Sequence, residues 1–545
     1  MLTILRLLPF VAVVLIVCWL GRFVRTERLR KLQTFPDSWI TVLAVGVAMT
    51  AATWFIWGSA AQPPLVHDEA SYLLQAETFA QGRWAMPSPP LPEFFEQFHV
   101  LVVPTFASKY PPGHGLLLAP GIWLGLPGLV PLILDGIAAA LLFMLVRRVT
   151  NGWVALLTLV LWLPMGSNLR FRPSYFSENT TSALWLAGWW ALLEWRESGR
   201  ERWLCVVAAC TGWMAITRPL TAVAFALPIA GVVLWSVFKR KNWRVLMRPM
   251  LIGVAIVSLL PIWSVNTTGS WRETPYTLYP KTYFPFDVAG FGLDTTPGTR
   301  PLPPDMSTLF NAFAGAHVMH TVDHLPRILF DRWNQMIGEA FGRLRGGLVL
   351  FALASLWILP AAGWFAVGGS FLLTLCYLVY AHPIDWDLYY LEIIPLFPFL
   401  TACGIWGIWT VLTNQRSIPR REILRTTTVQ TAVAGAILFT LLLIPLRAGV
   451  VAERRELAGL GWYHAAFADR VARLPGAKII VFIRFSPEHN VHDGLVTNHA
   501  NLADARAWLV HDRGAEDEAL MALAPDRVPY LYDEATGTTQ RLFAH

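Results

Sequence analysis

The chain has 545 residues, of which 55% are hydrophobic and only 14% are charged. A soluble domain carries about 25% charged residues, so this composition excludes an ordinary soluble protein. The net charge of +7 comes from short basic runs between apolar blocks. Such runs are typical of loops that set membrane topology, and they do not indicate a nucleic-acid-binding face. The lipid bilayer is therefore the first predicted partner.

Apolar blocks follow one another along most of the chain, and many have the length of a helix that crosses about 30 Å of hydrocarbon. They lie near 2–20, 38–61, 128–146, 152–168, 179–195, 203–217, 219–238, 249–266, 347–363, 365–381, 390–411 and 428–447. We expect an all-α polytopic membrane protein with about twelve transmembrane helices. The shorter apolar stretch 113–127 is broken by Pro and Gly, and it is predicted to be a helix lying at the membrane interface.

Four basic runs, at 22–31, 147–148, 239–248 and 416–425, determine the predicted orientation. Placing all four in the cytoplasm is consistent with single crossings between them. The loops 62–127, 169–178, 267–346 and 382–389 then face outward, together with the tail from about 448. This predicts a multi-pass protein of the inner (plasma) membrane whose polar loops are extracytoplasmic.

The tail has a different composition, and two domains are predicted: a transmembrane domain at 1–447 and a small extracytoplasmic α/β domain at 448–545. Within the tail, the hydrophobic pattern predicts a buried strand at 475–483 and a second strand at 528–533. It predicts a helix start at 501–510 and a helix at 515–523.

The first outward loop begins with His67, Asp68 and Glu69. A carboxylate pair at the water interface of a membrane helix can act as a general base for an acceptor hydroxyl. It can instead bind a divalent cation, Mg²⁺ or Mn²⁺, that neutralises a leaving phosphate. A third interpretation is a helix N-terminus, where Asp and Glu satisfy free backbone amides.

Further along the same loop, Lys109 precedes Tyr110, Pro111 and Pro112, and His114 follows. The two prolines disfavour a helix at Tyr110 and stiffen the approach to the interfacial helix. An ammonium group held there suits a lipid-linked phosphate. The alternative is a lysine that only reaches toward lipid headgroups.

The next outward loop holds Arg170 and Arg172, followed by Glu178 at the start of a span. Arginines outside the membrane oppose the usual charge bias, and Arg binds phosphate well. The alternative is an Arg–Glu pair that only closes the loop. Asp135 lies within a predicted span, and there we expect a packing hydrogen bond.

The long loop 267–346 interleaves aromatic residues with cations, including Arg272, Tyr276 and Lys281. This combination suits stacking on sugar rings and binding of phosphate. It is equally typical of an aromatic belt at the membrane surface.

The Asp68-Glu69 pair, Lys109 with Pro111 and Pro112, and a carboxylate at Glu178 occur in an order that resembles the GT-C superfamily. These are polyprenyl-phosphate-dependent glycosyltransferases, akin to the protein O-mannosyltransferases and the lipid A aminoarabinose transferase. Glu178 stands where many of those enzymes have Asp. The resemblance covers most of the chain.

The resemblance implies a GT-C-like catalytic domain that moves a sugar from a polyprenyl-phosphate donor to an extracytoplasmic acceptor, with inversion. The acceptor is a glycan, a lipid or a protein. Asp68 is then the base or acceptor-positioning group, and Glu69 and Glu178 complete the catalytic carboxylates. Lys109 and an outward arginine contact the donor phosphate. If a metal ion is bound, Asp68, Glu69 and Glu178 are its expected ligands. Two other classes stay open: a transporter or flippase of lipid-linked sugars, and a non-catalytic membrane protein that binds polysaccharide.

Overall fold

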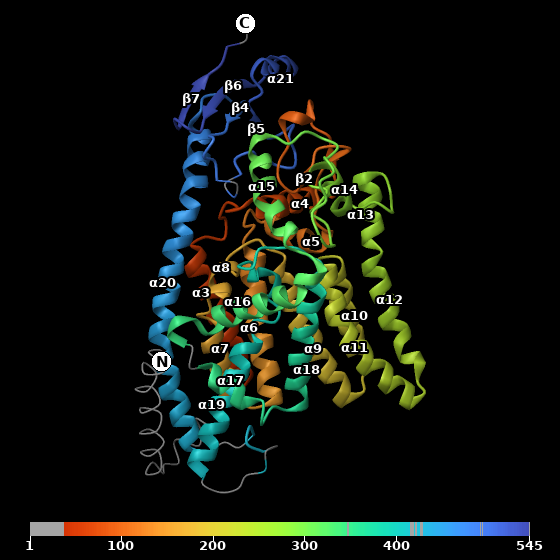
Figure 1. Ribbon diagram of the computed structural model, residues 1–545, viewed down its shortest axis with the longest axis vertical. Coiled ribbons are helices and arrows are strands. Elements are labelled where there is room, and N and C mark those ends of the chain that lie inside the picture. The colour runs from red at the N-terminus through yellow and green to blue at the C-terminus, as the bar shows by residue number, and fades with distance from the viewer. Residues whose placement is uncertain are drawn as a thin grey trace.

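The computed structural model describes residues 38–345, 348–414, 419, 422–425, 429–490, 492 and 494–543. A bundle of helices occupies one end of the molecule, and a small sheet near the C-terminus occupies the other end (Figure 1). Between them lies a cap layer, a name we use for α4, α5, β1 to β3, α14 and α15. A single long helix, α20, runs beside the bundle and reaches the sheet (Figure 1).

Within the described part of the chain, five helical segments are long and apolar enough to cross a membrane. They are α3 (Trp39–Trp57), α6 (Leu129–Val149), α11 (Pro219–Arg240), the segment Trp243–Thr268 that contains α12 (Met247–Val257) and α13 (Leu259–Thr268), and the segment Ala361–Val379 that contains α18 (Ala361–Cys376). Only 6% of the apolar window in Trp243–Thr268 is buried. An apolar surface this exposed is stable where it faces lipid.

The other helices of the bundle are shorter or more polar. They are α7 (Gly152–Trp162), α8 (Gly166–Phe171), α9 (Glu178–Ser198), α10 (Glu201–Ala215), α16 (Leu325–Arg345), α17 (Leu348–Ser355), α19 (Leu396–Asn414) and α20 (Val429–Arg473). Short 3-10 turns η3 (Trp243–Leu246), η4 (Val322–His324), η5 (Tyr377–Val379) and η6 (Asp387–Tyr390) join some of them. The expected block at 2–20 lies outside the described residues, and the count of about twelve crossings stays a prediction.

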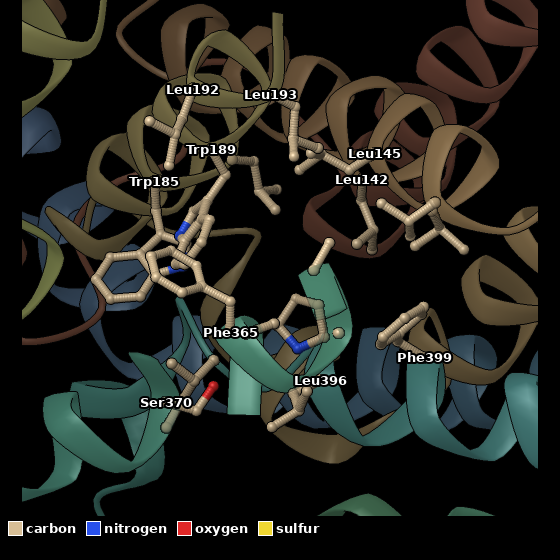
Figure 2. A pocket seen from close by; sticks show the side chains of 18 of the residues that line it. Leu142, Leu145, Trp185, Trp189, Leu192, Leu193, Phe365, Ser370, Leu396 and Phe399 are labelled. Atoms are coloured by element: carbon tan, nitrogen blue, oxygen red, sulfur yellow. The ribbon is translucent and has the colours of Figure 1, made fainter. Parts of the chain in front are cut away.

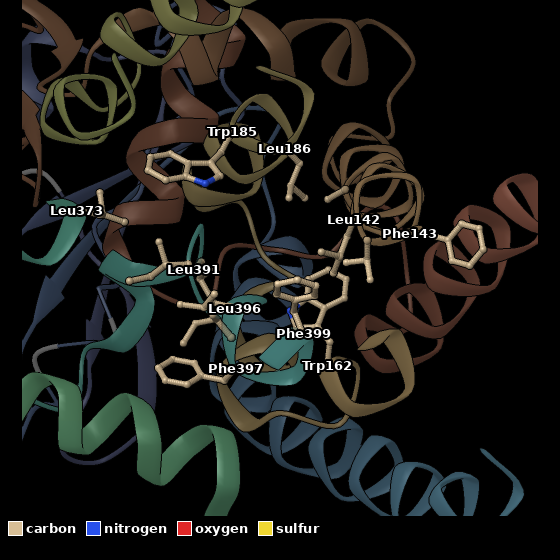
Figure 3. Close-up of a cluster of buried hydrophobic side chains, with 14 of the residues drawn as sticks. Leu142, Phe143, Trp162, Trp185, Leu186, Leu373, Leu391, Leu396, Phe397 and Phe399 are labelled. Atoms are coloured by element: carbon tan, nitrogen blue, oxygen red, sulfur yellow. The ribbon is translucent and has the colours of Figure 1, made fainter. Parts of the chain in front are cut away.

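The bundle is held together by a large apolar cluster, part of which is drawn in Figure 3. Trp162 and Phe143 are among its most buried members. Close helix contact also depends on glycine: a Cβ on Gly136 of α6 would lie 2.2 Å from the hydroxyl of Thr50 on α3. Small residues at such crossings let helices approach each other within a membrane.

Asp135 on α6 accepts a hydrogen bond from the Thr53 hydroxyl on α3, and the predicted packing hydrogen bond is confirmed. Its other carboxylate oxygen lies 3.7 Å from the guanidinium of Arg172. Both side chains are buried to within 1% of full burial. A charge in this position is stable only with a partner of opposite sign.

The cap layer contains α4 (His67–Ala80), α5 (Pro112–Trp123), α14 (Pro275–Tyr283), α15 (Pro304–Val318), the turn η2 (Pro92–Phe94) and three short strands. The strands β1 (Met86–Pro87), β2 (Val100–Leu101) and β3 (Thr105–Ser108) form an antiparallel sheet in the order β1-β3-β2. Val100 pairs with Ser108, so this turn brings His99 beside Lys109. The helix expected over 113–127 begins at Pro112, because Pro suits the first helical position.

The C-terminal sheet has four strands in the order β5-β4-β6-β7. They are β4 (Ile479–Arg484), β5 (Ala507–His511), β6 (Val528–Asp533) and β7 (Thr538–Arg541), with η7 (Gly514–Glu516) and α21 (Asp517–Leu523) between β5 and β6. The strands predicted at 475–483 and 528–533 and the helix predicted at 515–523 are confirmed. The mixed sheet fits the predicted α/β tail.

The helix start predicted at 501–510 is wrong, because 507–511 is strand β5, which pairs in parallel with β4. Trp508 and Val510 are buried there, and pairing with a buried neighbour overrides local helix preference. The predicted boundary at 447/448 falls within α20, a continuous helix of 45 residues. Its length is roughly 68 Å, so it joins the two predicted domains without a linker.

Candidate active site

Asp68 lies in the first turn of α4, which begins at His67 without a side-chain cap. The free amides of a helix N-terminus favour acidic side chains, so the local sequence places Asp68 and Glu69 there for structural reasons as well. The two carboxylates then diverge. The Asp68 side chain is 29% exposed, whereas Glu69 is buried. Only Asp68 is open to a substrate.

Three aromatic side chains surround the Asp68 carboxylate. The Tyr110 hydroxyl donates a hydrogen bond to it, the His67 imidazole nitrogen lies at 3.0 Å, and the His99 imidazole lies at 3.6 Å. Burial alone would raise the pKa of Asp68, but its contacts with His99 and His67 outweigh burial and hold that pKa well below the usual range. Asp68 is therefore ionised at neutral pH.

His99 is fixed mainly through its backbone. Its carbonyl accepts hydrogen bonds from the Ser71 hydroxyl and from the Lys109 amide, each at 2.8 Å. Its amide donates to the Tyr279 hydroxyl at 2.9 Å. These bonds hold a positive φ of 60° that few residues other than glycine adopt. Burial, followed by the nearby charge of Lys109, lowers the pKa of His99 to about 4.

Lys109 is buried, and its ammonium forms an ion pair with Asp287 at 3.2 Å. The Tyr380 hydroxyl donates to the other oxygen of Asp287 at 2.9 Å. Although burial would raise the pKa of Asp287, the Lys109 charge and the Tyr380 hydrogen bond lower it below the usual value. The ammonium thus has a fixed position beside an ionised carboxylate.

Aromatic rings form the wall between Asp68 and Lys109. The Lys109 ammonium lies 4.8 Å from the ring centre of Tyr279, 5.5 Å from that of Tyr110 and 5.8 Å from that of Tyr276. Tyr110 therefore contacts the lysine with its ring and Asp68 with its hydroxyl. A carboxylate and an ammonium, 41 positions apart in the sequence, share one aromatic neighbour.

Glu178 is connected to Tyr110 through Ser177 and Tyr72, but its own side chain is buried. It forms an ion pair with Arg218, whose guanidinium also donates to the Tyr377 hydroxyl at 2.8 Å. The Ser177 hydroxyl accepts from the Tyr72 hydroxyl and donates to Glu178, and Tyr72 stacks on Tyr110 with ring centres 4.4 Å apart. Glu178 thus lies behind the aromatic wall, in a buried pair.

Glu69 and His114 make structural contacts. The Glu69 oxygens accept hydrogen bonds from the backbone amides of Leu65 and Tyr175, at 2.7 and 2.8 Å. His114 is fully buried, and its ring nitrogens lie 2.8 Å from the Thr180 hydroxyl and 2.7 Å from the Tyr175 carbonyl. Both residues fasten α4 and α5 to the segment that precedes α9.

The two predicted phosphate-binding arginines lie in different surroundings. Arg172 is buried beside Asp135, with its guanidinium 5.0 Å from the Trp162 ring centre. Arg170 is 52% exposed and lies 3.9 Å from Glu456 on α20. Neither side chain contacts Asp68 or Lys109 in the described structure.

Of the three predicted residues in the long loop, one reaches the site. Tyr276 faces Lys109, as described above. Lys281 forms an exposed ion pair with Glu273 at 2.6 Å, and the Arg272 guanidinium lies 4.8 Å from the ring centre of its neighbour Trp271. The segment 267–346 also contains three helices, α14, α15 and α16.

The sequence pattern gave no role to Asp287, to Arg218 or to the two histidines beside Asp68. Asp287 is a single acid within an aromatic run, Tyr283 to Val288. Arg218 directly precedes the apolar block 219–238, on the predicted outward side of the membrane. Like Arg170, it is therefore an arginine that opposes the usual charge bias. Nothing in the sequence pairs His99 with Asp68, because that contact depends on the β2–β3 turn.

His67, Asp68 and His99 form a candidate metal site, since one ligand atom from each lies within 4.8 Å of the others. Glu69 and Glu178, the ligands expected from sequence, are engaged by backbone amides and by Arg218. Two imidazoles and one carboxylate suit Mn²⁺ better than Mg²⁺, which prefers oxygen ligands.

The segment after β4 closes one side of the site. His492 stacks on His67 with ring centres 5.8 Å apart. The Asn498 backbone amide donates a hydrogen bond to the Gln97 side chain. Glu77 of α4 accepts a hydrogen bond from the Ala500 amide and lies beside the His499 ring, at 2.9 Å in each case. The C-terminal domain therefore contacts the helix that carries Asp68.

No family model matches the chain, and no curated protein matches it either. Solved structures with a similar arrangement do exist. ArnT from Cupriavidus metallidurans bound to undecaprenyl phosphate has a TM-score of 0.46 at 15% identity, over 92% of this chain and 91% of ArnT. The archaeal oligosaccharyltransferase AglB from Archaeoglobus fulgidus, in complex with an inhibitory peptide and a dolichol-phosphate, has a TM-score of 0.39 at 12% identity, over 93% and 75%.

The arabinosyltransferase EmbB from Mycobacterium smegmatis has a TM-score of 0.31 at 16% identity, and the match covers 81% of this chain but only 44% of EmbB. Because these TM-scores are all below 0.5, the function proposed below rests on the geometry of the site. Over most of its length, the chain is structurally similar to ArnT and AglB.

Proposed function

We propose that this protein is a membrane glycosyltransferase that moves a sugar from a polyprenyl-phosphate donor to an extracytoplasmic acceptor, with inversion at the anomeric carbon. The observation that carries the proposal is the shared neighbour Tyr110, which contacts both the ionised Asp68 and the Lys109 ammonium. A transfer of this kind needs a base for the acceptor and a cation for the departing phosphate.

Asp68 is proposed as the base. The acceptor hydroxyl attacks the anomeric carbon, the bond from that carbon to the phosphate oxygen breaks, and the hydroxyl proton passes to Asp68. The products are the new glycoside and the polyprenyl phosphate. Because the pKa of Asp68 is low, proton transfer becomes favourable only as the acceptor oxygen bonds to carbon and gains acidity. Tyr110 and His67 orient the carboxylate through their contacts with it.

Lys109 is proposed to bind the donor phosphate. Its ion pair with Asp287 and the ring of Tyr279 hold the ammonium in place before the substrate arrives. A preorganised cation stabilises the charge that develops on the departing phosphate without reorganisation at that moment. Tyr276, on the same wall and 37% exposed, offers a face for stacking on the sugar ring.

The membrane arrangement is part of the proposal. About twelve helices are proposed to cross the bilayer, with a transmembrane domain at 1–447 and an extracytoplasmic domain at 448–545. The basic runs at 147–148 and 239–248 are then cytoplasmic, by the positive-inside rule. The cap layer, with Asp68 and Lys109, faces the outside of the cell membrane.

The experiment uses the full chain reconstituted in lipid nanodiscs, with a panel of radiolabelled polyprenyl-phosphate sugars and an extract of envelope acceptors. Label should appear in a glycosidic product, and Asp68→Asn should abolish it. The matched control is Asp294→Asn, because Asp294 is an exposed acid in the same layer. A flippase would move labelled lipid across the bilayer without forming a product, and that result would refute the proposal.

The role of the metal is tested in the same assay. If His67, Asp68 and His99 hold a divalent cation, chelation with EDTA removes activity and Mn²⁺ restores it. If Asp68 is the base without metal, EDTA leaves the rate unchanged. The presence of Lys109 close to His99 favours the second outcome, because a nearby positive charge opposes cation binding.

A further inference from the structure

A cavity lies inside the helix bundle, away from the cap layer. Its volume is about 320 Å³. Trp185, Trp189, Leu192 and Leu193 line one side, and Leu396 and Phe399 line another (Figure 2). The Phe365 ring packs against Trp189, with ring centres 4.6 Å apart. The walls come from α6, α9, α11, α18 and the segment that leads into α19. Three of these helices, α6, α11 and α18, are candidate membrane spans.

The cavity is long and apolar. It follows α9 from Trp185 to Arg196, a distance of about 16 Å at the helical rise per residue. Apolar cavities of this kind stay dry, because water finds too few hydrogen-bond partners in them. A hydrocarbon chain running along α9 suits such walls, because it needs no hydrogen-bond partners and packs against apolar side chains.

The two ends of the cavity differ in charge. Arg196 lies at the end formed by the last turn of α9. It is exposed, and no ion pair to it occurs among the described residues. Glu392 lies at the other end, buried to 3% exposure. One of its oxygens accepts from the Thr181 hydroxyl at 2.5 Å, and the other, Oε2, has no hydrogen-bond partner in the described structure.

We propose that this cavity binds one acyl chain of an anionic glycerophospholipid, with the lipid phosphate on Arg196. The charge of Arg196 complements a phosphate at the membrane surface. In the orientation proposed above, this surface belongs to the cytoplasmic leaflet. The site is therefore separate from the candidate active site.

The tail of a polyprenyl-phosphate donor is a poorer fit. Its phosphate would lie at Lys109, in the cap layer, so its tail would have to enter past the Glu392 carboxylate. A buried carboxylate offers an apolar chain no favourable contact.

The test is native mass spectrometry of the full chain, first stripped of lipid in detergent and then titrated with phosphatidylglycerol, phosphatidylethanolamine or undecaprenyl phosphate. We expect one phosphatidylglycerol per protein. Ala366→Phe places a ring in the cavity and should weaken binding about tenfold or more, because overpacking excludes the chain. Arg196→Gln should weaken phosphatidylglycerol about fivefold and phosphatidylethanolamine less.

The matched control is Gly368→Phe on the same helix, since a side chain at Gly368 meets nothing within 4 Å; it should bind like the unaltered protein. Thermal unfolding of each variant without lipid identifies any variant that fails to fold. If Ala366→Phe fails to fold, Ala362→Phe, which also alters the cavity wall, replaces it. Phosphatidylglycerol binding that persists in both wall variants overturns the proposal. So does binding of undecaprenyl phosphate alone that Ala366→Phe removes, since the cavity would then hold the donor's tail.

Discussion

The cap layer and the helix bundle each contain carboxylates paired with basic side chains, but the two regions expose their carboxylates differently. In the cap layer, the Asp68 side chain is 29% exposed and the Asp287 side chain is 16% exposed. In the bundle, Asp135 and Arg172 are exposed by at most 1%, and Glu178 by 3%. Solvent reaches Asp68 and Asp287, the carboxylate paired with the 5%-exposed Lys109, so the first group is proposed to act on substrates. The second group is proposed to hold helices together.

The largest expected effect is the loss of Asp68 as base. We expect Asp68→Asn to lower the transfer rate by about 10²–10⁴-fold, because the amide cannot accept the acceptor's proton. Thermal stability should change little, since the side chain is partly exposed. The rate is measured with saturating donor in nanodiscs, with Asp294→Asn as the control. Unchanged transfer in Asp68→Asn would show that the exposed carboxylate of the cap layer is not the base.

The second largest effect is expected at Lys109, the cation of the cap layer. Lys109→Gln should lower kcat by about 10²–10³-fold, because a preorganised charge on the departing phosphate is lost. Asp287→Asn, which leaves the lysine without its ion pair, should have a smaller effect on kcat and a larger one on the KM for donor. Steady-state kinetics over a range of donor concentrations separates the two. Equal losses in both variants would mean that the pair has only a structural role.

The buried pair of the bundle should behave in the opposite way. Asp135→Leu removes the acid that is paired with Arg172, and breaking a buried pair lowers the free energy of unfolding by about 3–5 kcal/mol. The donor KM of the protein that remains folded should not change. The double variant Asp135→Leu with Arg172→Met should recover much of the stability, because no uncompensated charge is left. Thermal unfolding of all three proteins tests this, and a double variant no more stable than Asp135→Leu would contradict it.

The smallest expected effect lies at the contact between the C-terminal domain and α4. The hydrogen bond from His499 to Glu77 raises the pKa of His499 above its usual value. A histidine with a raised folded-state pKa contributes stability that is fully present below about pH 6.5 and is lost as pH rises through the folded pKa. The His499 side chain is 75% exposed, so the contribution is below about 1 kcal/mol.

Glu77→Gln should therefore lower the midpoint of thermal unfolding at pH 5.5 and change it less at pH 8. The Glu77 oxygen that accepts from the Ala500 amide has a counterpart in Gln, so that bond serves as an internal control. A difference that is larger at pH 8 would show that the raised pKa has no part in the contact.

The comparison also explains which parts of the site could be predicted. Asp68 and Lys109 stand out in the sequence because each interrupts an apolar context near a turn signal, and the structure brings both to Tyr110. Arg172 stands out for the same reason, yet its partner Asp135 is 37 positions away, within a span. Local pattern identifies a charge that needs a partner, but it does not say whether that partner is a substrate or another helix.

The sequence alone determined the membrane class, the basic runs, two of the four C-terminal strands and the order of the polar motifs. These follow from composition and from hydrophobic periodicity, which are local properties of the chain. The tertiary structure decided the low pKa of Asp68, the pairing of Lys109 with Asp287, strand β5 and the cavity along α9. Each depends on contacts between residues far apart in the chain, whose burial and distance no local pattern specifies.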